Sequence, residues 1–239
     1  REEMRANLSG DVSDHVRTLM PFTDELKDVG IISLTETRDN LLMWSHYGDN
    51  HRGLVIEYNI NHPFFTSLDG HTERLGRVRY RKRRTEGLVP DRQNPGMVDL
   101  YAPLFEKSDE WIYEKEHRVI RKFANSDHIS VNKEFWDEHA SHTLDTPPPT
   151  THGGKKYELT GPAKPLPTVL LNSSELLCFF RIPVDAIVSV TCGALMSKDS
   201  VNIVKAKAEE HGFVCQKATI DDDDYCLQFE TLTFTEKQD

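Results

Sequence analysis

Short apolar runs separated by polar turns occupy much of the first half of the chain. Strands are predicted at residues 29–35, 53–60, 77–80 and 117–123, where β-branched and aromatic residues cluster. The first run, VGIISLT, has few polar positions and predicts a buried strand. The alternating run RVRY at 77–80 predicts an exposed or edge strand instead.

Three segments have the spacing or the end signals of helices. Residues 1–28 predict one or two helices, and residues 101–111 predict another. Residues 37–47 begin with capping residues and are followed by Gly48, which predicts a helix with a C-terminal glycine stop.

The C-terminal third has a clearer pattern. Strands are predicted at residues 175–182, 186–192, 213–220 and 225–232. Between the second and third of these strands, Ser197 or Asp199 can cap a helix that Gly212 ends. The expected fold is therefore α+β, with mixed β-sheets, packed helices and a C-terminal strand-helix-strand subdomain.

A proline- and glycine-rich segment interrupts this order and suggests a boundary. Six of the chain's 12 prolines lie between residues 141 and 167. We therefore expect an N-terminal α+β part at 1–140, a loop or linker at 141–168, and a C-terminal α/β part at 169–239.

Composition excludes several broad classes of protein. The 39 acidic residues outnumber the 29 basic ones, which gives a formal net charge of −10 and argues against a histone-like coat of nucleic acid. No apolar run approaches the roughly 18 residues of a membrane span, and no signal segment opens the chain. A cytoplasmic protein without a membrane partner is expected.

The cysteines point to no metal chemistry. Cys178, Cys192, Cys215 and Cys226 form no C-x-x-C pair and no zinc-type spacing with histidine. We expect buried free thiols, and no metal site is predicted. The run Asp221–Asp224 lacks the spacing of a calcium loop and predicts a solvated turn.

The first candidate for chemistry lies between Trp44 and Gly53, where a helix end meets a strand start. Here His46 and His51 could move protons near neutral pH, and Trp44 or Tyr47 could stack on a planar ligand. The alternative is an ordinary capped helix end, in which His46 makes only structural hydrogen bonds.

The second candidate is the sequence WIYEKEHR at 111–118. On a strand, Glu114, Glu116 and Arg118 would share one face, and the arginine would hold one carboxylate ionised beside the other. On a helix, Glu114 and Arg118 would form only an i,i+4 ion pair.

A basic stretch reverses the local charge between these two motifs. Residues 74–84 hold seven Lys or Arg residues and no acid. Arg77, Arg79 and Arg81 could hold a phosphate-bearing or nucleotide ligand there. The alternative is a solvated strand-and-loop face.

Several of these residues together resemble a bacterial family known as domain of unknown function 2971. The likeness rests on GIISLTE at 30–36, LMWSHY at 42–47 and NHRGLVI at 50–56. The W-x-x-E-x-E-x-R pattern at 111–118 resembles a second block, and Ile182-Pro183 with Gly193 resembles the family's C-terminal part. The resemblance also implies an opening strand and an Asn-Asp-Pro loop, which are not visible before Arg1.

The family name carries no activity, but one spacing is similar to that of ADP-ribosyltransferases. Ser33-x-Thr35 on a strand, followed by Glu114-x-Glu116, resembles the serine and glutamate elements of those enzymes. This likeness implies NAD as substrate, Glu116 as the carboxylate that stabilises the ribosyl cation, and Glu114 as the group that orients the acceptor.

The same likeness assigns roles to the remaining candidates. Ser33 and Thr35 would brace the NAD pocket, Tyr47 or Trp44 would stack on the base, and His46 would contact ribose or phosphate. His51 and Arg118 complete the expected binding residues.

Two other hypotheses stay open at this point. A hydrolase or nuclease would use His46, His51 and Glu116, with the basic stretch holding phosphate. A non-catalytic binding or regulatory module would bury His46 and Tyr47, pair Glu114 with Arg118, and lack a cleft between the two motifs.

Overall fold

The computed structural model of the chain describes most of its length. The described residues are 26–85, 89–91, 96–141, 148–151, 153–160, 173 and 175–233. Of the segment 1–28, which was predicted as one or two helices, residues 1–25 lie outside this set.

Strands supply most of the regular structure. They are β1 (Val29–Thr35), β2 (Leu54–Tyr58), β3 (Arg74–Arg77), β4 (Arg79–Arg81), β5 (Glu106–Ser108), β6 (Glu116–Lys122), β7 (His128–Asn132), β8 (Thr150–Thr151), β9 (Lys156–Thr160), β10 (Leu176–Phe179), β11 (Ile187–Cys192), β12 (Val214–Ile220) and β13 (Leu227–Thr231).

Helices are fewer and mostly short. The α-helices are α2 (Leu41–Tyr47), α3 (Pro63–Thr66), α4 (Lys133–His139) and α6 (Lys198–His211). The 3₁₀ helices are η1 (Leu26–Asp28), η2 (Ala102–Phe105), η3 (Asp109–Glu114), η4 (Phe123–Asn125) and η6 (Val184–Ala186). The strands and helices together give a mixed α+β fold, as predicted.

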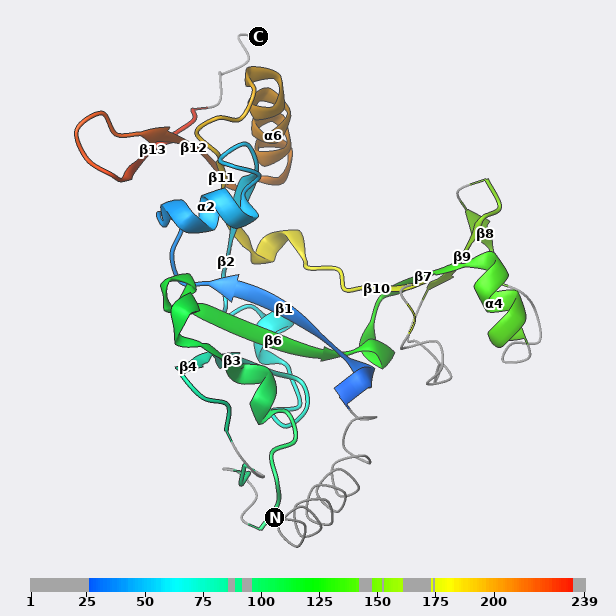
Figure 1. Cartoon of the computed structure of the whole chain (residues 1–239). Helices are drawn as coiled ribbons and strands as arrows, with labels where there is room; N and C mark the ends of the chain where they lie inside the picture. Colours follow the sequence, from blue (N-terminus) through cyan, green and yellow to red (C-terminus); the bar gives the residue numbers. More distant parts are fainter. Residues whose placement is uncertain are drawn as a thin grey trace, which may run out of the picture.

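The sheet β1-β6-β3 is antiparallel (Figure 1), and it carries the Ser33-x-Thr35 pattern on β1 and residues 116–118 of the second motif on β6. Its register pairs Thr35 with Glu116 and Ser33 with Arg118. Val119 and Ile120 in its central strand are fully buried, Val119 in a cluster with Phe65 and Ala186, and Ile120 in a cluster with Phe105. Packing of apolar residues around this strand therefore fixes the position of β6 relative to β1.

A second sheet, β13-β12-β11-β2, contains the predicted C-terminal strand-helix-strand unit. β11 and β12 are parallel and α6 joins them, with Ser197 as its N-cap and Gly212 as its left-handed C-cap. Cys192, Cys215 and Ala208 form the core between this sheet and the helix. Both thiols are free and buried, as expected, whereas Cys178 and Cys226 are half-buried.

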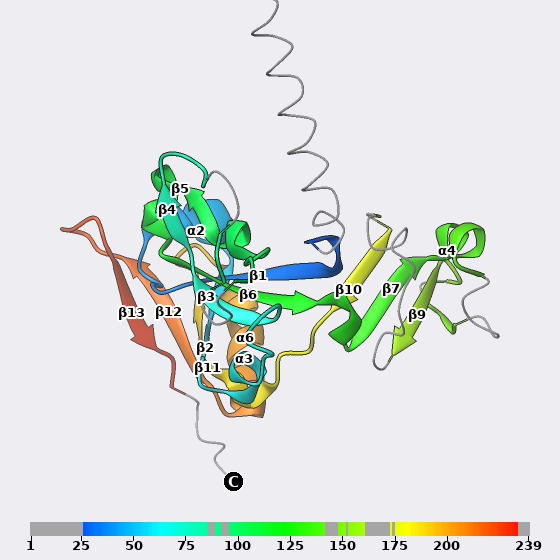
Figure 2. The same cartoon turned by 90° about the horizontal axis from the view of Figure 1, so that it is seen from below.

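The sheet β10-β7-β9-β8 lies with α4 at one side of the molecule, away from α6 and β12, in both views (Figures 1 and 2). Trp136 of α4 packs against Val131, Ala140 and Tyr157 in a cluster of its own. We call these elements the β7–β10 lobe. Two of its strands, β8 and β9, lie within the segment predicted as a loop or linker, so that prediction was wrong there.

Three other local predictions also need correction. β1 is not buried throughout, because Ile31 is 42% exposed and Ser33 is exposed as well. Residues 101–111 form no continuous helix, since η2, β5 and the start of η3 divide them. Gly48 ends α2 as predicted, but the helix begins at Leu41, after the N-cap Asn40, and not at residue 37.

The strand pairing crosses the predicted domain boundary. β2, from the expected N-terminal part, pairs with β11 from the expected C-terminal part. The two parts therefore share one sheet, and the division of the chain into domains stays a prediction.

Candidate functional site

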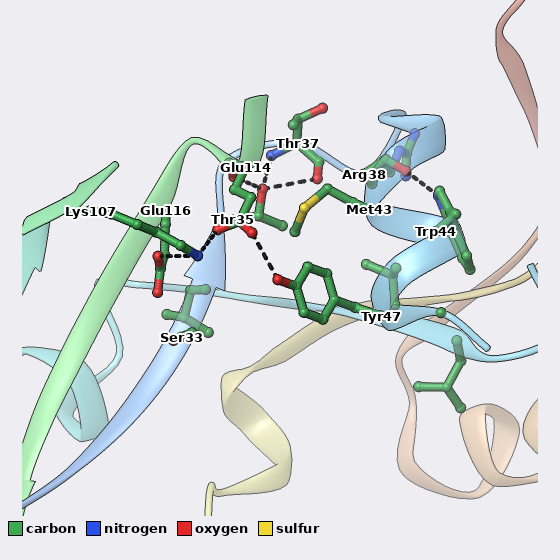
Figure 3. A pocket seen from close by; sticks show the side chains of 14 residues that line it. Ser33, Thr35, Thr37, Arg38, Met43, Trp44, Tyr47, Lys107, Glu114 and Glu116 are labelled. Atoms are coloured by element: carbon green, nitrogen blue, oxygen red, sulfur yellow. Dashed lines mark hydrogen bonds and ion pairs between the residues drawn. The ribbon is translucent and has the colours of Figure 1, made fainter. Parts of the chain in front are cut away.

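The two sequence motifs meet at one cavity of about 320 Å³. β1 contributes Ser33 and Thr35, α2 contributes Tyr47, and Glu114 and Glu116 line the same space (Figure 3). Residues about 80 positions apart in the chain come together because β1 and β6 pair along their whole length. The volume is at the lower end of the roughly 300–1,000 Å³ typical of small-molecule sites.

A sharp turn places Glu114 and Glu116 side by side although they lie on different elements. Lys115 between them adopts a left-handed conformation with φ 46°, which turns the chain from η3 into β6. The hydroxyl of Thr35 donates to the Glu114 carbonyl at 2.7 Å and fixes this turn to β1. The expectation that both glutamates lie on one strand was therefore wrong.

Asn40 attaches the helix of the first motif to the second motif. Its side-chain oxygen caps α2 by accepting from the amide of Leu42 at 2.9 Å, and its side-chain nitrogen donates to the Tyr113 carbonyl at 3.1 Å. α2 is thus held against η3, and Tyr47 near its end reaches over Glu114.

Lys107, from β5, joins the two carboxylates. Its ammonium group donates to Glu114 and, at 3.2 Å, to Glu116. The other oxygen of Glu114 accepts from the Tyr47 hydroxyl at 2.8 Å. Glu114 and Glu116 are 3% and 4% exposed, so these partners replace the water that each carboxylate would otherwise bind.

Arg118 binds Glu116 and not Glu114. Its Nε donates to one oxygen of Glu116 at 2.8 Å, and Nη2 reaches the other at 3.2 Å. This two-point contact agrees with the strand interpretation for Glu116 and Arg118 and contradicts the helical i,i+4 pair. Arg118 is thereby committed to holding the carboxylate in place.

The pKa values of the cavity groups follow from these contacts. Burial raises the pKa of Glu116, but the hydrogen bonds from Arg118 and Ser33 and the charge of Arg118 outweigh it, so the pKa lies below its ordinary value. The hydrogen bond to Glu114 raises the pKa of Tyr47. Burial lowers the pKa of Lys107, but its bonds to Glu114 and Glu116 raise it above the ordinary value. The Glu116 carboxylate and the Lys107 ammonium are therefore charged near neutral pH.

The other aromatic candidates lie differently from Tyr47. Trp44 is only 2% exposed and stacks on His51 at 6.2 Å between ring centroids, so little of its ring is open to a ligand. His46 is exposed and makes edge contacts with Tyr47 and Trp111. Neither histidine lines the cavity, whereas Tyr47, at 62% exposed, presents its ring there.

Two cations in the cavity were missed by the sequence analysis. Lys107 lies in EKS, which was assigned to a helix, so its link to the E-x-E glutamates could not be inferred. Arg38 lies in the segment 37–47 that was predicted as a helix, although α2 begins only at Leu41, and it carries no motif signal of its own. Nothing in the sequence distinguishes Arg38 or Lys107 from an ordinary surface charge, and only the folded structure shows that they line the cavity.

The basic stretch is largely paired with acids. Arg77 contacts Glu36 at 3.5 Å, and Arg79 and Arg81 each contact Glu106 at 3.2 Å. These ion pairs agree with the solvated-face alternative, and the expected phosphate ligand at these residues stays a prediction. The segment Asp221–Asp224 is a largely exposed turn, as predicted. The Asp221 carboxylate accepts hydrogen bonds from the amides of Asp223 and Asp224.

Other features of the described residues bear on the broad class of site. No group of three or more His, Cys, Asp or Glu side chains in the described part of the chain could hold a metal ion. None of the helices described above is long and apolar enough to cross a membrane.

Comparison with known proteins gives one match. Residues 43–119 match a family described as protein of unknown function (DUF2971). The matched segment runs from α2 into β6 and includes Tyr47, Lys107, Glu114 and Glu116, while Ser33, Thr35 and Arg38 precede it. No curated protein and no solved structure matches the chain. The comparisons therefore give no support to the likeness with ADP-ribosyltransferases.

Proposed function

We propose that the cavity is an active site that cleaves the nicotinamide–ribose bond of NAD, with Glu116 as the catalytic carboxylate. The observation that carries this proposal is the shared cavity itself. An ionised, buried carboxylate, the hydroxyl groups of β1 and the exposed ring of Tyr47 all face one space large enough for part of a nucleotide.

The chemistry requires negative charge beside a sugar. When the bond between ribose C1′ and the pyridinium nitrogen breaks, its electron pair leaves with nicotinamide, and positive charge develops on the ribose. Glu116 stabilises that charge without prior reorganisation, because Arg118 and Lys107 already hold its carboxylate in place. A nucleophilic acceptor then bonds to C1′ and loses its proton.

The remaining cavity residues have supporting roles in this proposal. Tyr47 offers its ring to the nicotinamide, and its hydroxyl group holds Glu114 at 2.8 Å. Glu114 orients the acceptor. Ser33 and Thr35 keep β1 in register with the turn that carries both glutamates.

The geometry gives less support to a nuclease. That hypothesis requires His46 and His51 beside Glu116, but neither histidine lines the cavity. A module that binds a ligand without cleaving it is the second candidate, because Lys107, Arg118 and Tyr47 already engage both carboxylates.

Replacement of Glu116 by Gln tests the catalytic role. The purified protein is incubated with NAD, and free nicotinamide is measured by liquid chromatography. We expect the wild-type protein to release nicotinamide and E116Q to lose at least about 100-fold of that rate, since the charge opposite the ribose is gone. Circular dichroism shows whether the variant keeps its fold.

Glu110→Gln is the matched control. Glu110 is exposed on η3 and lies outside the cavity, so E110Q should release nicotinamide at the wild-type rate. Equal rates in E116Q and wild type would contradict the proposal. Saturable binding of NAD without release of nicotinamide would favour the binding module.

A further inference from the structure

We infer that Arg38 is the anion-binding group of the cavity, and that the cavity takes a ligand carrying a phosphate group at that end. The inference adds a phosphate group to the class of ligand that the cavity binds. It rests on the proposed function for where the nicotinamide and ribose of that ligand lie. It concerns an arginine that precedes the segment matched by the family.

Arg38 is a cation without an acidic partner in the described part of the chain. Its guanidinium group donates to the side-chain oxygen of Gln216 and lies over the ring of Phe229, with 4.4 Å to the centroid. The other cation of the cavity, Lys107, is occupied by Glu114 and Glu116. A half-buried guanidinium with unused donors beside a cavity favours an oxyanion.

The C-terminal sheet positions this guanidinium. Gln216 lies on β12. Its side-chain oxygen accepts from the Thr191 hydroxyl of β11 at 3.4 Å, and its side-chain nitrogen donates to the Thr231 hydroxyl of β13 at 3.5 Å. The side-chain oxygen of Gln216 therefore has a fixed place from which it accepts from Arg38. Phe229 covers one face of the guanidinium group, so the remaining N–H groups are restricted in direction.

The two ends of the cavity therefore differ in charge: the carboxylates lie at one end and Arg38 at the other. Figure 3 shows Lys107, Glu116 and Ser33 on one side, Arg38 and Trp44 on the other, and Tyr47 between them. A ligand with a cationic ring and sugar at the Glu116 side and a phosphate at the Arg38 side matches these charges. Arginine binds phosphate through parallel N–H···O bonds, which are stronger than bonds between neutral groups.

A pair of ligands that differ only in the phosphate tests this inference. Nicotinamide mononucleotide carries a 5′-phosphate, and nicotinamide riboside lacks it. Dissociation constants are measured by isothermal titration calorimetry, with intact ligand verified by chromatography after each titration. We expect the wild-type protein to bind the phosphorylated ligand about tenfold more tightly than the riboside.

Variants separate an anion-binding role from a structural one. Arg38→Gln should abolish the preference for the phosphorylated ligand while the dissociation constant of the riboside changes less than about threefold. Gln216→Leu removes the group that positions Arg38 and should reduce the preference in part. Arg52→Gln is the matched control, because Arg52 is exposed and does not line the cavity.

Each outcome has a defined meaning. A preference that R38Q retains, equal weakening of both ligands, or no binding of either ligand by the folded wild-type protein would overturn the inference. Phosphate-dependent binding through Arg38 without release of nicotinamide from NAD would support the inference and contradict the proposed function. Release of nicotinamide from NAD, with the same ligand preference in R38Q and wild type, would support the proposed function and contradict the inference.

Discussion

At the scale of single residues, Lys107 is the cation that contacts both carboxylates of the cavity. Glu114 and Glu116 are both buried, and two carboxylates this close would favour protonation of one of them. The ammonium group of Lys107 contacts both and compensates for that repulsion. Lys107 and Arg118 together therefore allow the ionised Glu116 carboxylate to persist beside a second acid.

Replacement of Lys107 by Met should show this dependence. Two buried carboxylates would lose a common cation, and we expect the free energy of unfolding at pH 7 to fall by about 3 kcal/mol. The measurement is urea unfolding followed by circular dichroism. Lys115→Met is the control, because the side chain of Lys115 is exposed, and it should leave the unfolding free energy nearly unchanged.

The pH dependence of this variant has a definite sign. The folded-state pKa of Glu116 lies below its unfolded value, so its stabilisation is complete above the unfolded pKa and is lost as the pH falls through the folded one. Without Lys107 the folded pKa of Glu116 rises. The acid-unfolding midpoint of K107M should therefore lie at a higher pH than that of the wild type, and an unchanged midpoint would contradict this role.

At the scale of elements, a left-handed turn after α2 locks the first motif to the C-terminal sheet. Asp49, Asn50 and His51 have φ values of 48°, 49° and 65°, and these are residue types that tolerate this region better than most. The amide of Leu195 donates to the His51 carbonyl at 2.8 Å, and that of Gly193 donates to Gly53 at 2.9 Å. The chain that leaves β11 therefore lies directly on this turn.

Gly193→Ala tests this contact. A Cβ atom at Gly193 would lie 2.2 Å from the His51 carbonyl oxygen, and backbone on both sides leaves no flexible group to move aside. We expect a loss of about 3 kcal/mol in the free energy of unfolding, measured with urea. Gly212→Ala should cost only about 1 kcal/mol, since Gly212 has φ 77° but no atom within 4 Å of the added Cβ. Equal losses would argue against a tight fit at Gly193.

Elements with strong end signals were predictable from the sequence, and those defined by tertiary pairing were not. Ser197 and Gly212 marked the ends of α6, and apolar runs marked β1, β6 and β11. Residues 101–111 were predicted as a helix, yet β5 divides them because Glu106–Ser108 pairs with β4. No local pattern specifies such a pairing, since its hydrogen bonds depend on a distant segment.

The same distinction applies to the candidate site. The sequence predicted that β1, Tyr47, Glu114 and Glu116 belong together, and the structure brings them to one cavity. The directions of Trp44 and His46 were not predictable, because one turn of a short helix decides which ring is buried. Arg38 and Lys107 gave no sequence signal, since a charge acquires its partners only in the folded chain.

At the scale of the whole molecule, the β7–β10 lobe is separate from the part that carries the cavity. The lobe lies between β6 and β11 in the chain, and the matched family segment ends at residue 119, before it begins. Its apolar cluster around Trp136 contains only residues of the lobe. The cavity and its neighbouring clusters draw on other elements. We expect the two parts to lose structure independently.

Trp136→Ala, followed by hydrogen exchange and mass spectrometry, is the measurement that decides this point. Trp136 is 2% exposed, and its removal should cost about 3–5 kcal/mol, which is enough to open a small sheet. We expect the amides of β7 and β9 to exchange much faster, while those of β1 and β6 keep their wild-type protection.

Trp44→Ala is the matched substitution in the other part, because Trp44 is equally buried but packs in α2 beside the cavity. It should raise exchange in α2 and leave β7 and β9 protected. If W136A instead exposed β1 and β6 as much as β7 and β9, the molecule would unfold as one cooperative unit, and the lobe would be part of the scaffold that holds Glu116.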